Sequence, residues 1–413
     1  MRFLINPIGS YGDVYPFIAI GRQLAERGHD VHLVASGYFG DAIERAGLAC
    51  TPIGDPEDYE RMVGDADLSN PRRALKLIAT AISETLPRTY QILDQRTTDD
   101  TVLVGSTLSF ATRIVNEVRG NPWIPVHLAP SIFRSNIAPP RFLEQGLPPW
   151  LPGAFADAMW WIGDRIVIDP LWATGVNEFR SSLGLEPISR IFRDWIHSPD
   201  LTIGLFPDWF GPRQTDWPNG VQLTGFPLYD QPEPGLPPEV EAFLDAGDPP
   251  VVFVSGTATA SEARFYAESV WGCTRAGVRG LLLTRFPQQL PDDLPDGVTH
   301  FPSIPFSQLL PRCRAIVHHG GVGTLSQALR AGIPQIVRPY GFDQFDNADR
   351  LVRLGVGREI PNGKYRAVRV ARVLETLSED PTLQQTCRDV ADRFTEDAVS
   401  TTCSLLESRA DGI

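Results

Sequence analysis

The stretch HHGGVGTLSQALRAGIPQIVRPYGFDQFDN, residues 318–347, decides the fold of this chain. It follows an apolar run over residues 315–317 that is typical of a buried strand. A glycine-rich turn and a short helical pattern over residues 325–330 come next, and then a second apolar run over residues 333–337. The order strand, glycine-rich turn, helix, strand predicts one unit of a parallel α/β sheet.

The glycine-rich turn predicts a phosphate site. Glycine permits positive φ and lets a ligand approach the backbone closely, and a helix N-terminus offers free N–H groups and the positive end of a dipole. We expect a diphosphate to be held by the backbone N–H groups of this turn and by the threonine hydroxyl at its end. The residues concerned are Gly321, Val322, Gly323 and Thr324.

Other polar side chains should converge on the same ligand, because the loops after parallel strands share one sheet edge. Ser255 and Thr257 follow an apolar run over residues 251–254 and would approach the same phosphates. Asp343 and Gln344 follow the second apolar run of the stretch. A carboxylate beside an amide suits vicinal hydroxyls, which indicates that the diphosphate carries a sugar.

The start of the chain repeats this design, with a predicted strand over residues 2–6, a helix over 17–27 and a strand over 31–35. Because 413 residues exceed one ordinary core, we predict an α/β fold of two Rossmann-like domains that face each other across a cleft. The predicted segments are an N-terminal domain (1–228) with a loop at 55–70, a proline-rich linker (229–250), a C-terminal domain (251–385) and a final helix (386–413).

Composition and charge exclude several classes of protein. The chain carries 37 basic and 50 acidic residues, a formal charge of −13, which argues against a nucleic-acid-binding protein and provides no polybasic membrane anchor. Five scattered cysteines without a Cys-x-x-Cys pair indicate neither a disulfide framework nor a zinc site. No apolar run approaches the roughly 20 residues that span a bilayer, and the opening lacks a signal-peptide pattern. We therefore expect a cytoplasmic protein.

Two groups of residues resemble a known family. His319 before the glycine-rich turn, with Asp343 and Gln344 after the next strand, resembles the donor-binding signature of the family 1 nucleotide-sugar glycosyltransferases, which have the two-domain GT-B fold. Residues 9–17, GSYGDVYPF, match the first turn of that family, and the resemblance covers nearly the whole chain. Three further stretches, residues 195–199, 205–207 and 224–228, look most like the rhamnosyltransferase subunit of rhamnolipid synthesis. Bacterial sterol and glycopeptide glycosyltransferases are more distant relatives.

The resemblance implies a role for each matching residue. Asp13 would be the general base, His319 would contact the donor diphosphate, and Asp343 with Gln344 would bind sugar hydroxyls. Without the resemblance, Asp13 would be interpreted as a first-turn acid that stabilises the helix dipole. An aspartate with a pKa near ~4 is a weak base, so the site must raise that pKa, as a dry, aromatic-lined cleft would. The final helix of that family crosses back onto the N-terminal domain.

The acceptor side is predicted from a different region, residues 129–172, which is rich in proline and aromatic residues. A long aromatic insertion in an α/β domain often builds a pocket wall, and a satellite core under long loops is the alternative. We expect acceptor contacts from Gly12 in the first turn, from His127 at a strand end and from Phe133 in the insertion. No metal site is predicted, and no cofactor is expected besides the donor substrate.

Two departures from the family bear on the nucleotide. Plant relatives stack the base on a tryptophan before Val-Pro, where this chain has Ser303, Ile304 and Pro305. Base recognition therefore falls to the backbone near Ile304 and Phe306, or to another aromatic ring. The glutamate that holds the ribose diol in many UDP-sugar enzymes is Gln327 here. Both departures favour dTDP over UDP.

The sequence thus predicts an inverting, metal-independent glycosyltransferase. It would move a hexose, rhamnose or glucose, from a dTDP- or UDP-sugar to a hydroxyl of an apolar small-molecule or lipid acceptor, and a lipid acceptor would bring peripheral membrane contact. A sugar-nucleotide epimerase shares the fold but needs no aromatic acceptor region. A non-catalytic partner subunit that binds nucleotide sugars is a further alternative, which Asp13 beside an intact donor motif disfavours.

Overall fold

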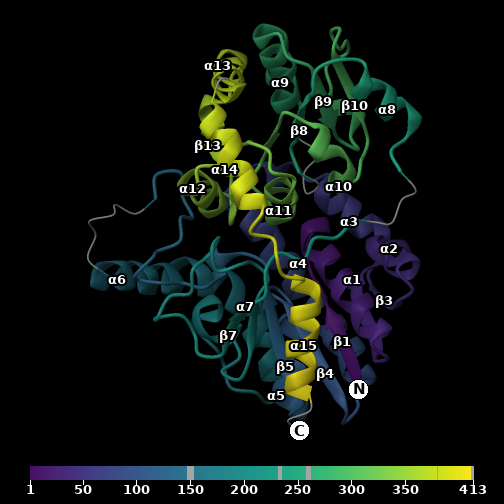
Figure 1. The fold of residues 1–413 in the computed structure, drawn as a ribbon. Coiled ribbons are helices and arrows are strands. Elements are labelled where there is room, and N and C mark those ends of the chain that lie inside the picture. Colours follow the sequence, from purple (N-terminus) through teal and green to yellow (C-terminus); the bar gives the residue numbers. More distant parts are fainter. Residues whose placement is uncertain (147–152, 231–234, 257–261, 379, 411–413) are drawn as a thin grey trace.

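The computed structural model describes residues 1–146, 153–230, 235–256, 262–378 and 380–410. It contains two sheets, each in its own α/β unit, with the strand orders β3-β2-β1-β4-β5-β6-β7 and β10-β9-β8-β11-β12-β13 (Figure 1). All strand pairings are parallel, which confirms the predicted α/β fold of two Rossmann-like domains. The strands are β1 (Arg2–Asn6), β2 (Asp30–Ser36), β3 (Ala49–Ile53), β4 (Thr101–Ser106), β5 (Trp123–His127), β6 (Thr202–Gly204), β7 (Val221–Leu223), β8 (Val251–Val254), β9 (Gly280–Leu283), β10 (Val298–Phe301), β11 (Ala315–His318), β12 (Gln335–Val337) and β13 (Gly357–Glu359).

The N-terminal sheet is covered by helices on both faces, as parallel sheets require. Alternate residues of a strand point to opposite faces, so Phe3 and Ile5 of β1 join one apolar cluster with α1 and α15, and Leu4 joins another with α4, α5 and α7. The helices of this layer arrangement are α1 (Tyr11–Glu26), α2 (Gly40–Arg45), α3 (Pro56–Val63), α4 (Pro71–Arg96), α5 (Phe110–Arg119), α6 (Gly153–Gly163), α7 (Asp169–Ser182) and α15 (Ala398–Ala410).

The C-terminal sheet follows the same rule. Phe253 of β8 and Val317 of β11 pack with one set of helices, and Val252 and Ile316 pack with another. Val240 of α8 belongs to the second cluster, so part of the segment predicted as a linker contributes to this core. The helices are α8 (Pro238–Asp245), α9 (Ala263–Ala276), α10 (Phe306–Leu309), α11 (Val322–Ala331), α12 (Gln344–Arg353), α13 (Ala367–Ser378) and α14 (Pro381–Ala391).

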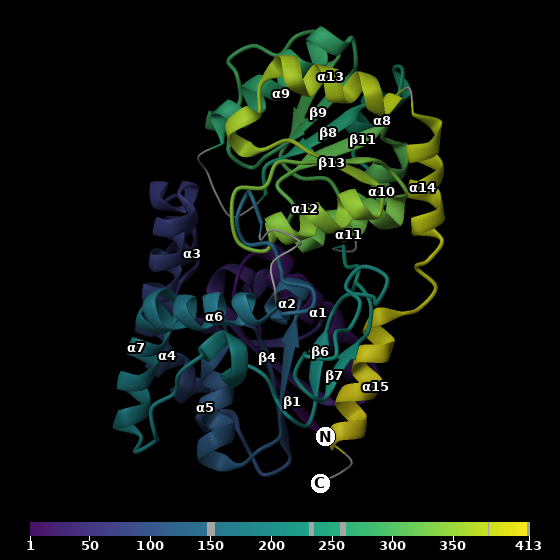
Figure 2. The ribbon, with the colours of Figure 1, turned by 90° about the vertical axis from the view of Figure 1, so that its left-hand side faces the viewer.

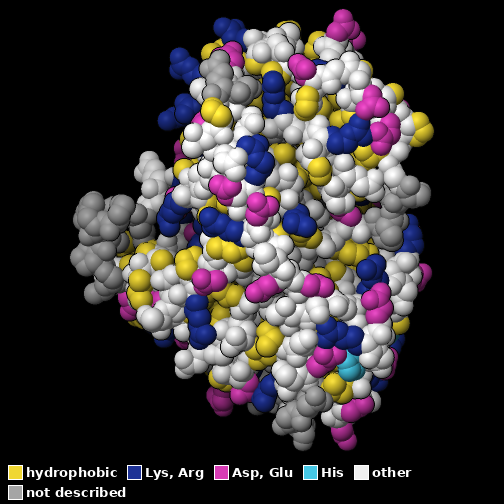
Figure 3. Space-filling model, viewed as in Figure 1, with side chains coloured by type: hydrophobic (Ala, Val, Ile, Leu, Met, Phe, Trp, Pro, Cys, Tyr) yellow, Lys and Arg dark blue, Asp and Glu magenta, His cyan; other side chains and the backbone are white. Residues whose placement is uncertain are grey.

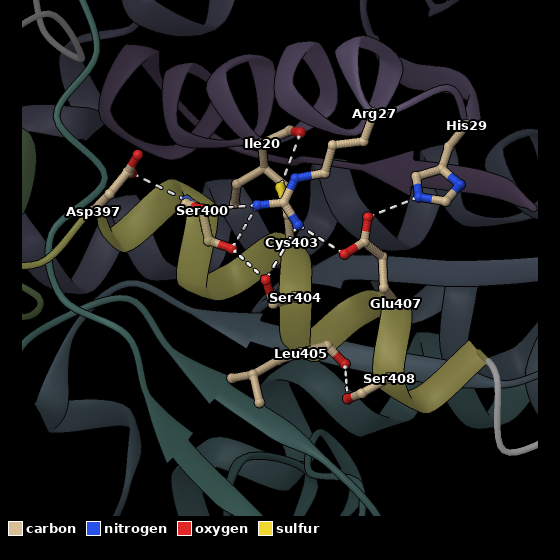
Figure 4. Close-up of polar contacts among 10 residues, drawn as sticks. All are labelled: Ile20, Arg27, His29, Asp397, Ser400, Cys403, Ser404, Leu405, Glu407 and Ser408. Atoms are coloured by element: carbon tan, nitrogen blue, oxygen red, sulfur yellow. Dashed lines mark hydrogen bonds and ion pairs between the residues drawn. The ribbon is translucent and has the colours of Figure 1, made fainter.

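The end of the chain crosses between the two domains. Where the sequence predicts one final helix, the structure has α14 beside the C-terminal domain and α15 along the N-terminal domain (Figure 2). α15 packs on α1 through Cys403 and Leu406, which are buried with the N-terminal core. Glu407 anchors it further, because its carboxylate accepts from Arg27 Nη1 at 2.7 Å and lies 2.8 Å from His29 Nε2 (Figure 4).

The prediction of a loop over residues 55–70 is wrong. Residues 56–63 form α3, which begins with a capping box in which the Asp55 and Asp58 side chains bind the backbone at each other's position, with Pro56 at the first helical position. These are strong helix-start signals, but the acidic composition of the segment hid them. The error matters because α3 carries Tyr59 into the interdomain cleft.

The aromatic segment after β5 forms α6, a π-helical turn over Asp164–Ile168 (η4) and α7. Several of its large apolar side chains are exposed, and apolar atoms reach the surface beside α6 (Figure 3). Others are buried or line the cleft, so both predicted outcomes, pocket wall and satellite core, occur in different parts of the segment. Among the described residues, no helix combines the length and apolar character needed to cross a membrane.

Candidate active site in the interdomain cleft

A cavity of about 1960 Å³ lies between the two domains, and both domains line it. Ligand pockets typically measure roughly 300–1,000 Å³, so this cavity has room for more than one ligand. Its floor on the N-terminal side comes from the turn after β1 and the start of α1, and on the C-terminal side from the turn after β11 and the start of α11. These are the carboxyl ends of parallel strands, where open α/β sheets bind ligands.

The turn after β1 is closed by its own side chains. Asp13, in the first turn of α1, accepts hydrogen bonds through Oδ2 from the Ser10 backbone N–H at 2.7 Å and from the Ser10 hydroxyl at 3.0 Å. Gly9 has φ of 139°, and a Cβ there would collide with the Asp13 carboxylate, so glycine is required. Burial raises the pKa of Asp13, while the hydrogen bonds from Ser10 oppose that rise. Asp13 is therefore both a capping residue and a half-buried carboxylate that lines the cleft.

The turn after β11 is open instead. α11 begins three residues before the predicted helical pattern, at Val322, and its N-cap residue Gly321 provides no side-chain cap. The backbone N–H groups of the first turn therefore lack a side-chain acceptor from the cap, and the lining residues Gly321, Val322, Gly323 and Thr324 place them at the cleft. This arrangement is the predicted anion site.

His319 lies against this turn and lines the cleft. Burial, with a further contribution from Arg338, lowers the pKa of His319 to about 4, so the ring is neutral at pH 7. Its Nδ1 has no hydrogen-bond partner among the described residues. Side chains at Gly256 or Gly321 would collide with the imidazole. The preceding His318 ends β11, is buried and lies 2.9 Å from Gln335 Oε1, so it is structural.

The two turns meet across the cleft at a pair of glycines. A Cβ on Gly323 of α11 would lie 3.4 Å from the Cα of Gly12 in α1. Because neither residue has a side chain, the N-termini of α1 and α11 approach each other directly. Gly12, which was predicted to contact the acceptor, therefore lines the cleft at the point where the two halves of the site join.

Asp343 is the N-cap residue of α12 and lines the cleft. Burial raises its pKa to about 7, with a further contribution from the charge of Asp13, while the hydrogen bond from Asn347 Nδ2 at 2.7 Å opposes the rise. The residue before it, Phe342, has φ of 57°, which is uncommon for a bulky side chain and is found at functional turns. Gln344 lines the cleft, but its Oε1 accepts from the Tyr340 backbone N–H at 3.0 Å, which leaves the amide nitrogen for a ligand.

The residues predicted to surround the base also line the cleft. Ile304 is buried, Phe306 starts α10, and Gln327 lies in the second turn of α11. Gln327 Nε2 lies 3.5 Å from Oδ1 of Asp230, a residue of the segment between the domains. The sequence had not pointed to Asp230, which also accepts from the Ser307 backbone N–H at 2.8 Å.

Three predicted site residues lie elsewhere. Ser255 is 2% exposed and its hydroxyl is bonded to Tyr266, so Gly256 rather than Ser255 lines the cleft. His127 is fully buried, with Nδ1 2.9 Å from the Thr107 hydroxyl. Phe133 is 1% exposed and stacked on Trp217, so the acceptor contacts predicted for it and for His127 are corrected to core positions. Thr257 lies outside the described residues.

Sequence reasoning missed a cluster of tyrosines beside Asp13. Tyr11 and Tyr38 are joined by a hydrogen bond of 3.0 Å between their hydroxyls, and Tyr59 stacks on Tyr38. Arg285, from the loop after β9, donates to both hydroxyls of that pair, and its guanidinium lies 4.4 Å from the Tyr11 ring centroid. The position of Tyr11 two residues before Asp13 in the first motif could have pointed to this cluster. No feature of the sequence pointed to the contact with Arg285, which comes from the other domain.

No group of three or more His, Cys, Asp or Glu side chains is placed to hold a metal ion in the part of the chain that the structure describes. Asp13 and Asp343 are both half-buried, each in or next to the first turn of a helix that faces the cleft. Metal independence of the reaction remains a prediction.

Comparison with known proteins agrees with this site. Residues 3–135 match the family model of the glycosyltransferase family 28 N-terminal domain, and residues 283–404 match the erythromycin biosynthesis protein CIII-like C-terminal domain. The chain is 31% identical over 430 residues to O-mycaminosyltylonolide 6-deoxyallosyltransferase of Streptomyces fradiae, with 100% of this chain and 98% of that protein covered. It is 32% identical over 373 residues to glycosyltransferase GtfE of Amycolatopsis orientalis, with 86% and 85% covered.

Solved structures show the same fold. The spinosyn rhamnosyltransferase SpnG complexed with thymidine diphosphate superposes with a TM-score of 0.68 at 19% identity, covering 98% of this chain and 100% of that chain. The glycosyltransferase of kitacinnamycin superposes with a TM-score of 0.75 at 17% identity, covering 99% of both chains. The fold is thus GT-B. With full-length similarity to named glycosyltransferases, the chain belongs to the family 1 GT-B glycosyltransferases and is an enzyme of nucleotide-sugar-dependent glycosyl transfer.

Proposed function

We propose that this enzyme is an inverting, metal-independent hexosyltransferase that uses a dTDP-sugar in preference to a UDP-sugar and glycosylates a hydroxyl of an apolar acceptor. One observation carries the proposal. The half-buried Asp13 carboxylate, the uncapped N-terminus of α11, His319 and Asp343 all line one cavity, joined where Gly12 meets Gly323.

The donor diphosphate binds at the start of α11. Its negative charge is stabilised by the open backbone N–H groups and by the helix dipole. His319, neutral at pH 7, donates an N–H hydrogen bond to a phosphate oxygen. Asp343 and the amide nitrogen of Gln344 bind hydroxyls of the sugar. A cation is not required in this arrangement, because the helix terminus supplies the positive potential.

The chemical step is a single displacement at C1 of the sugar. Asp13 accepts the proton of the acceptor hydroxyl while its oxygen forms a bond to C1, and the bond from C1 to the β-phosphate oxygen breaks. The nucleoside diphosphate leaves with the electron pair, and the configuration at C1 inverts. The raised pKa of Asp13 makes it a stronger base than an ordinary aspartate. The N-terminus of α11 and His319 stabilise the charge that develops on the leaving group.

The acceptor occupies the remaining, mostly apolar part of the cavity. Its wall includes Leu75 and Ile78 of α4, Trp160 of α6 and Trp172 of α7. The 6-deoxyallosyltransferase to which the chain is 31% identical is named for a glycosylated macrolide lactone. A large apolar alcohol is the class of acceptor that this wall favours.

The dTDP preference rests on Gln327 and on named complexes. Asp230 lies beside Gln327, so a glutamate at this position would face a second carboxylate, whereas the neutral amide does not. The amide is a weaker acceptor for a ribose diol, and a deoxyribose has no such diol. SpnG and VinC were both crystallised with thymidine diphosphate.

Mass-spectrometric product analysis tests the proposal. The enzyme is incubated with dTDP-rhamnose or UDP-glucose and a panel of macrolide, sterol and fatty alcohols, with and without exhaustive EDTA treatment. We expect a product heavier by one hexosyl or deoxyhexosyl group, formed with a dTDP-sugar and retained after EDTA treatment. Loss of activity that magnesium or manganese restores would contradict the metal-independent mechanism.

A further inference from the structure

The apolar wall of the cavity contains one charged pair. Among the described residues of α6, η4 and α7 that line the cavity, Asp164 is the only charged one. It is 2% exposed, and its Oδ1 accepts from Nη1 of Arg134, which is itself largely buried. The ring of Trp160 lies 5.3 Å from the Arg134 guanidinium carbon. The pair is therefore a built feature of the wall rather than a surface ion pair.

One atom of this pair is unsatisfied. Oδ2 of Asp164 is buried and has no hydrogen-bond partner among the described residues. A buried carboxylate oxygen without a donor is unfavourable, because it has lost water and gained nothing in return. Arg134 cannot relieve it alone, since only one contact between the two side chains forms. Asp164 lines the cavity, but this oxygen is closed to solvent. A donor group that entered the cavity beside it would complete the pair after a small rotation of the side chain.

The backbone at this position is also unusual. Asp164 begins the π-helical turn η4, directly after Gly163 of α6. Such turns are rare and are frequent at functional sites, although this chain has a second one over Ile191–Trp195. In η4 Asp164 is buried, whereas the neighbouring Ile166 is 68% exposed.

Polar surroundings continue behind the pair. Arg134 and Trp160 also line a second cavity of about 480 Å³, whose lining is mostly polar and includes His197 and Asn219. The ion pair thus stands where the apolar cavity borders a polar one. A ligand with a polar group on an apolar body matches this boundary.

We propose that Asp164, held by Arg134, is a binding subsite for a hydrogen-bond-donating group, a hydroxyl or an ammonium, on an otherwise apolar acceptor. This group is distinct from the hydroxyl that receives the sugar. The inference rests on the proposed function for the identity of the ligand as the acceptor, but the binding of a donor group to Asp164 does not require turnover.

Calorimetric titration without any sugar nucleotide tests the subsite. The probes share one alkyl chain: 1-decanol and decylamine carry a hydrogen-bond donor, and 1-methoxydecane carries none. We expect the wild type to bind 1-decanol roughly ten- to hundredfold more tightly than 1-methoxydecane, the range for a hydrogen bond to a charged group, and decylamine more tightly still.

Three variants locate the preference. Asp164→Leu should abolish it while leaving 1-methoxydecane binding unchanged or stronger. Asp164→Asn keeps an oxygen for Arg134 but puts an amide N–H₂ in place of Oδ2, so it should favour the ether and lose the gain for decylamine. Asp157→Asn is the matched control, because Asp157 lies on α6, pairs with Arg193 at 2.7 Å and does not line the cavity. It should behave as the wild type.

Several outcomes would overturn the proposal. A donor preference that survives in Asp164→Leu would place the recognition elsewhere, for example at Asp13. Equal loss of all probes in both Asp164 variants would show a structural role only, and thermal unfolding of each variant separates that case from misfolding. Failure of every probe to bind the wild type would show that the cavity has no such subsite. Product analysis with sugar nucleotides is independent of these results, so failure of the proposed function is recognised separately.

Discussion

The two glycine-rich turns of the molecule have the same architecture but are capped differently. In the N-terminal domain, Asp13 and Ser10 form a capping box that closes the start of α1. In the C-terminal domain, Gly321 supplies no side-chain cap, so the start of α11 stays open. The same strand–turn–helix unit thus holds the chain's own carboxylate in one domain and presents free backbone N–H groups in the other.

The difference decides which half of the reaction each domain can serve. In α1 the Asp13 carboxylate accepts from the backbone N–H and the hydroxyl of Ser10, which fixes its position. Its negative charge at this helix start disfavours phosphate binding there. An open helix start attracts a diphosphate, because its free N–H groups and the helix dipole present positive potential. Since Gly12 and Gly323 bring the two turns into contact, the Asp13 carboxylate and the open start of α11 face one cavity.

The largest expected effect comes from the closed turn. Asp13→Asn keeps the size of the side chain and an oxygen for the cap, but it removes the base. Transfer should fall by roughly 10²–10⁴-fold, the usual contribution of a general base, with little change in donor affinity. Steady-state kinetics and donor calorimetry measure the two effects.

Ser10→Ala is the control. It removes a hydrogen bond that lowers the pKa of Asp13, so the acid limb of the pH–rate profile should move to higher pH. The large fall in transfer expected for Asp13→Asn should not occur. Wild-type transfer by Asp13→Asn would refute the mechanism.

The open turn should respond to His319→Ala. The donor and the free nucleotide should both bind roughly ten- to hundredfold more weakly, because both carry the diphosphate and a hydrogen bond to a charged group contributes about 1.5–3 kcal/mol. The neutral ring also predicts little pH dependence of this effect above pH 6. His318→Ala is unsuitable as a control, since His318 is bonded in the core. Thr85→Ala, in the cavity but on α4 of the N-terminal domain, serves instead. An unchanged affinity for free dTDP would remove His319 from the diphosphate site.

Asp343 connects the two turns, because the charge of Asp13 contributes to raising its pKa to about 7. If only the carboxylate binds the sugar, affinity for the sugar nucleotide should rise roughly tenfold from pH 6 to pH 8 as the ionised fraction grows, while affinity for the free nucleotide stays flat. Asp13→Asn should move this transition to lower pH. Calorimetry over that pH range measures both, and Asp343→Ala, which has no carboxyl group to titrate, should abolish the rise. Equal losses for both ligands in Asp343→Ala would contradict a sugar contact.

The same pKa also predicts a trend in stability. Because the folded-state pKa of Asp343 lies above its value in the unfolded chain, the folded state binds more protons between about pH 4 and pH 7. The contribution of this group to stability is therefore present at low pH and is lost as pH rises through about 7. Asp343→Asn should unfold at a higher temperature than the wild type at pH 8, with the difference shrinking toward pH 4, and thermal denaturation at both values checks this.

The smallest effect concerns the nucleotide. We expect dTDP to compete with UDP with a preference of a few-fold to about tenfold, where about 1.4 kcal/mol corresponds to tenfold. Gln327→Glu should shift the preference toward UDP, but the nearby Asp230 opposes a second carboxylate. The pair Gln327→Glu with Asp230→Asn should therefore shift it further than Gln327→Glu alone. Competitive titration of both nucleotides decides, and a clear UDP preference in the wild type would refute the inference.

The sequence alone determined the local units. Strand, turn and helix follow from apolar runs and glycine positions that act over a few residues, which is why both motif turns, His319, Asp343 and the two-domain α/β fold were predicted correctly in place. Three segments were exceptions: α3, where an acidic composition outweighed the capping signals, α8 in the predicted linker, and the final helix, which is two helices, α14 and α15.

Only the tertiary structure decided how these units meet. Whether His127 and Phe133 face the cleft or the core depends on side chains far away in the sequence, and the folded chain buried both. Arg285 reaches Tyr11 from the other domain, and Asp164 is left with an unpaired oxygen by the packing around Arg134. Such contacts depend on long-range geometry and desolvation, and so does the pKa of Asp343, which is raised by burial and by a carboxylate 330 positions earlier in the chain. Long-range geometry and desolvation cannot be predicted from a pattern of neighbouring residues.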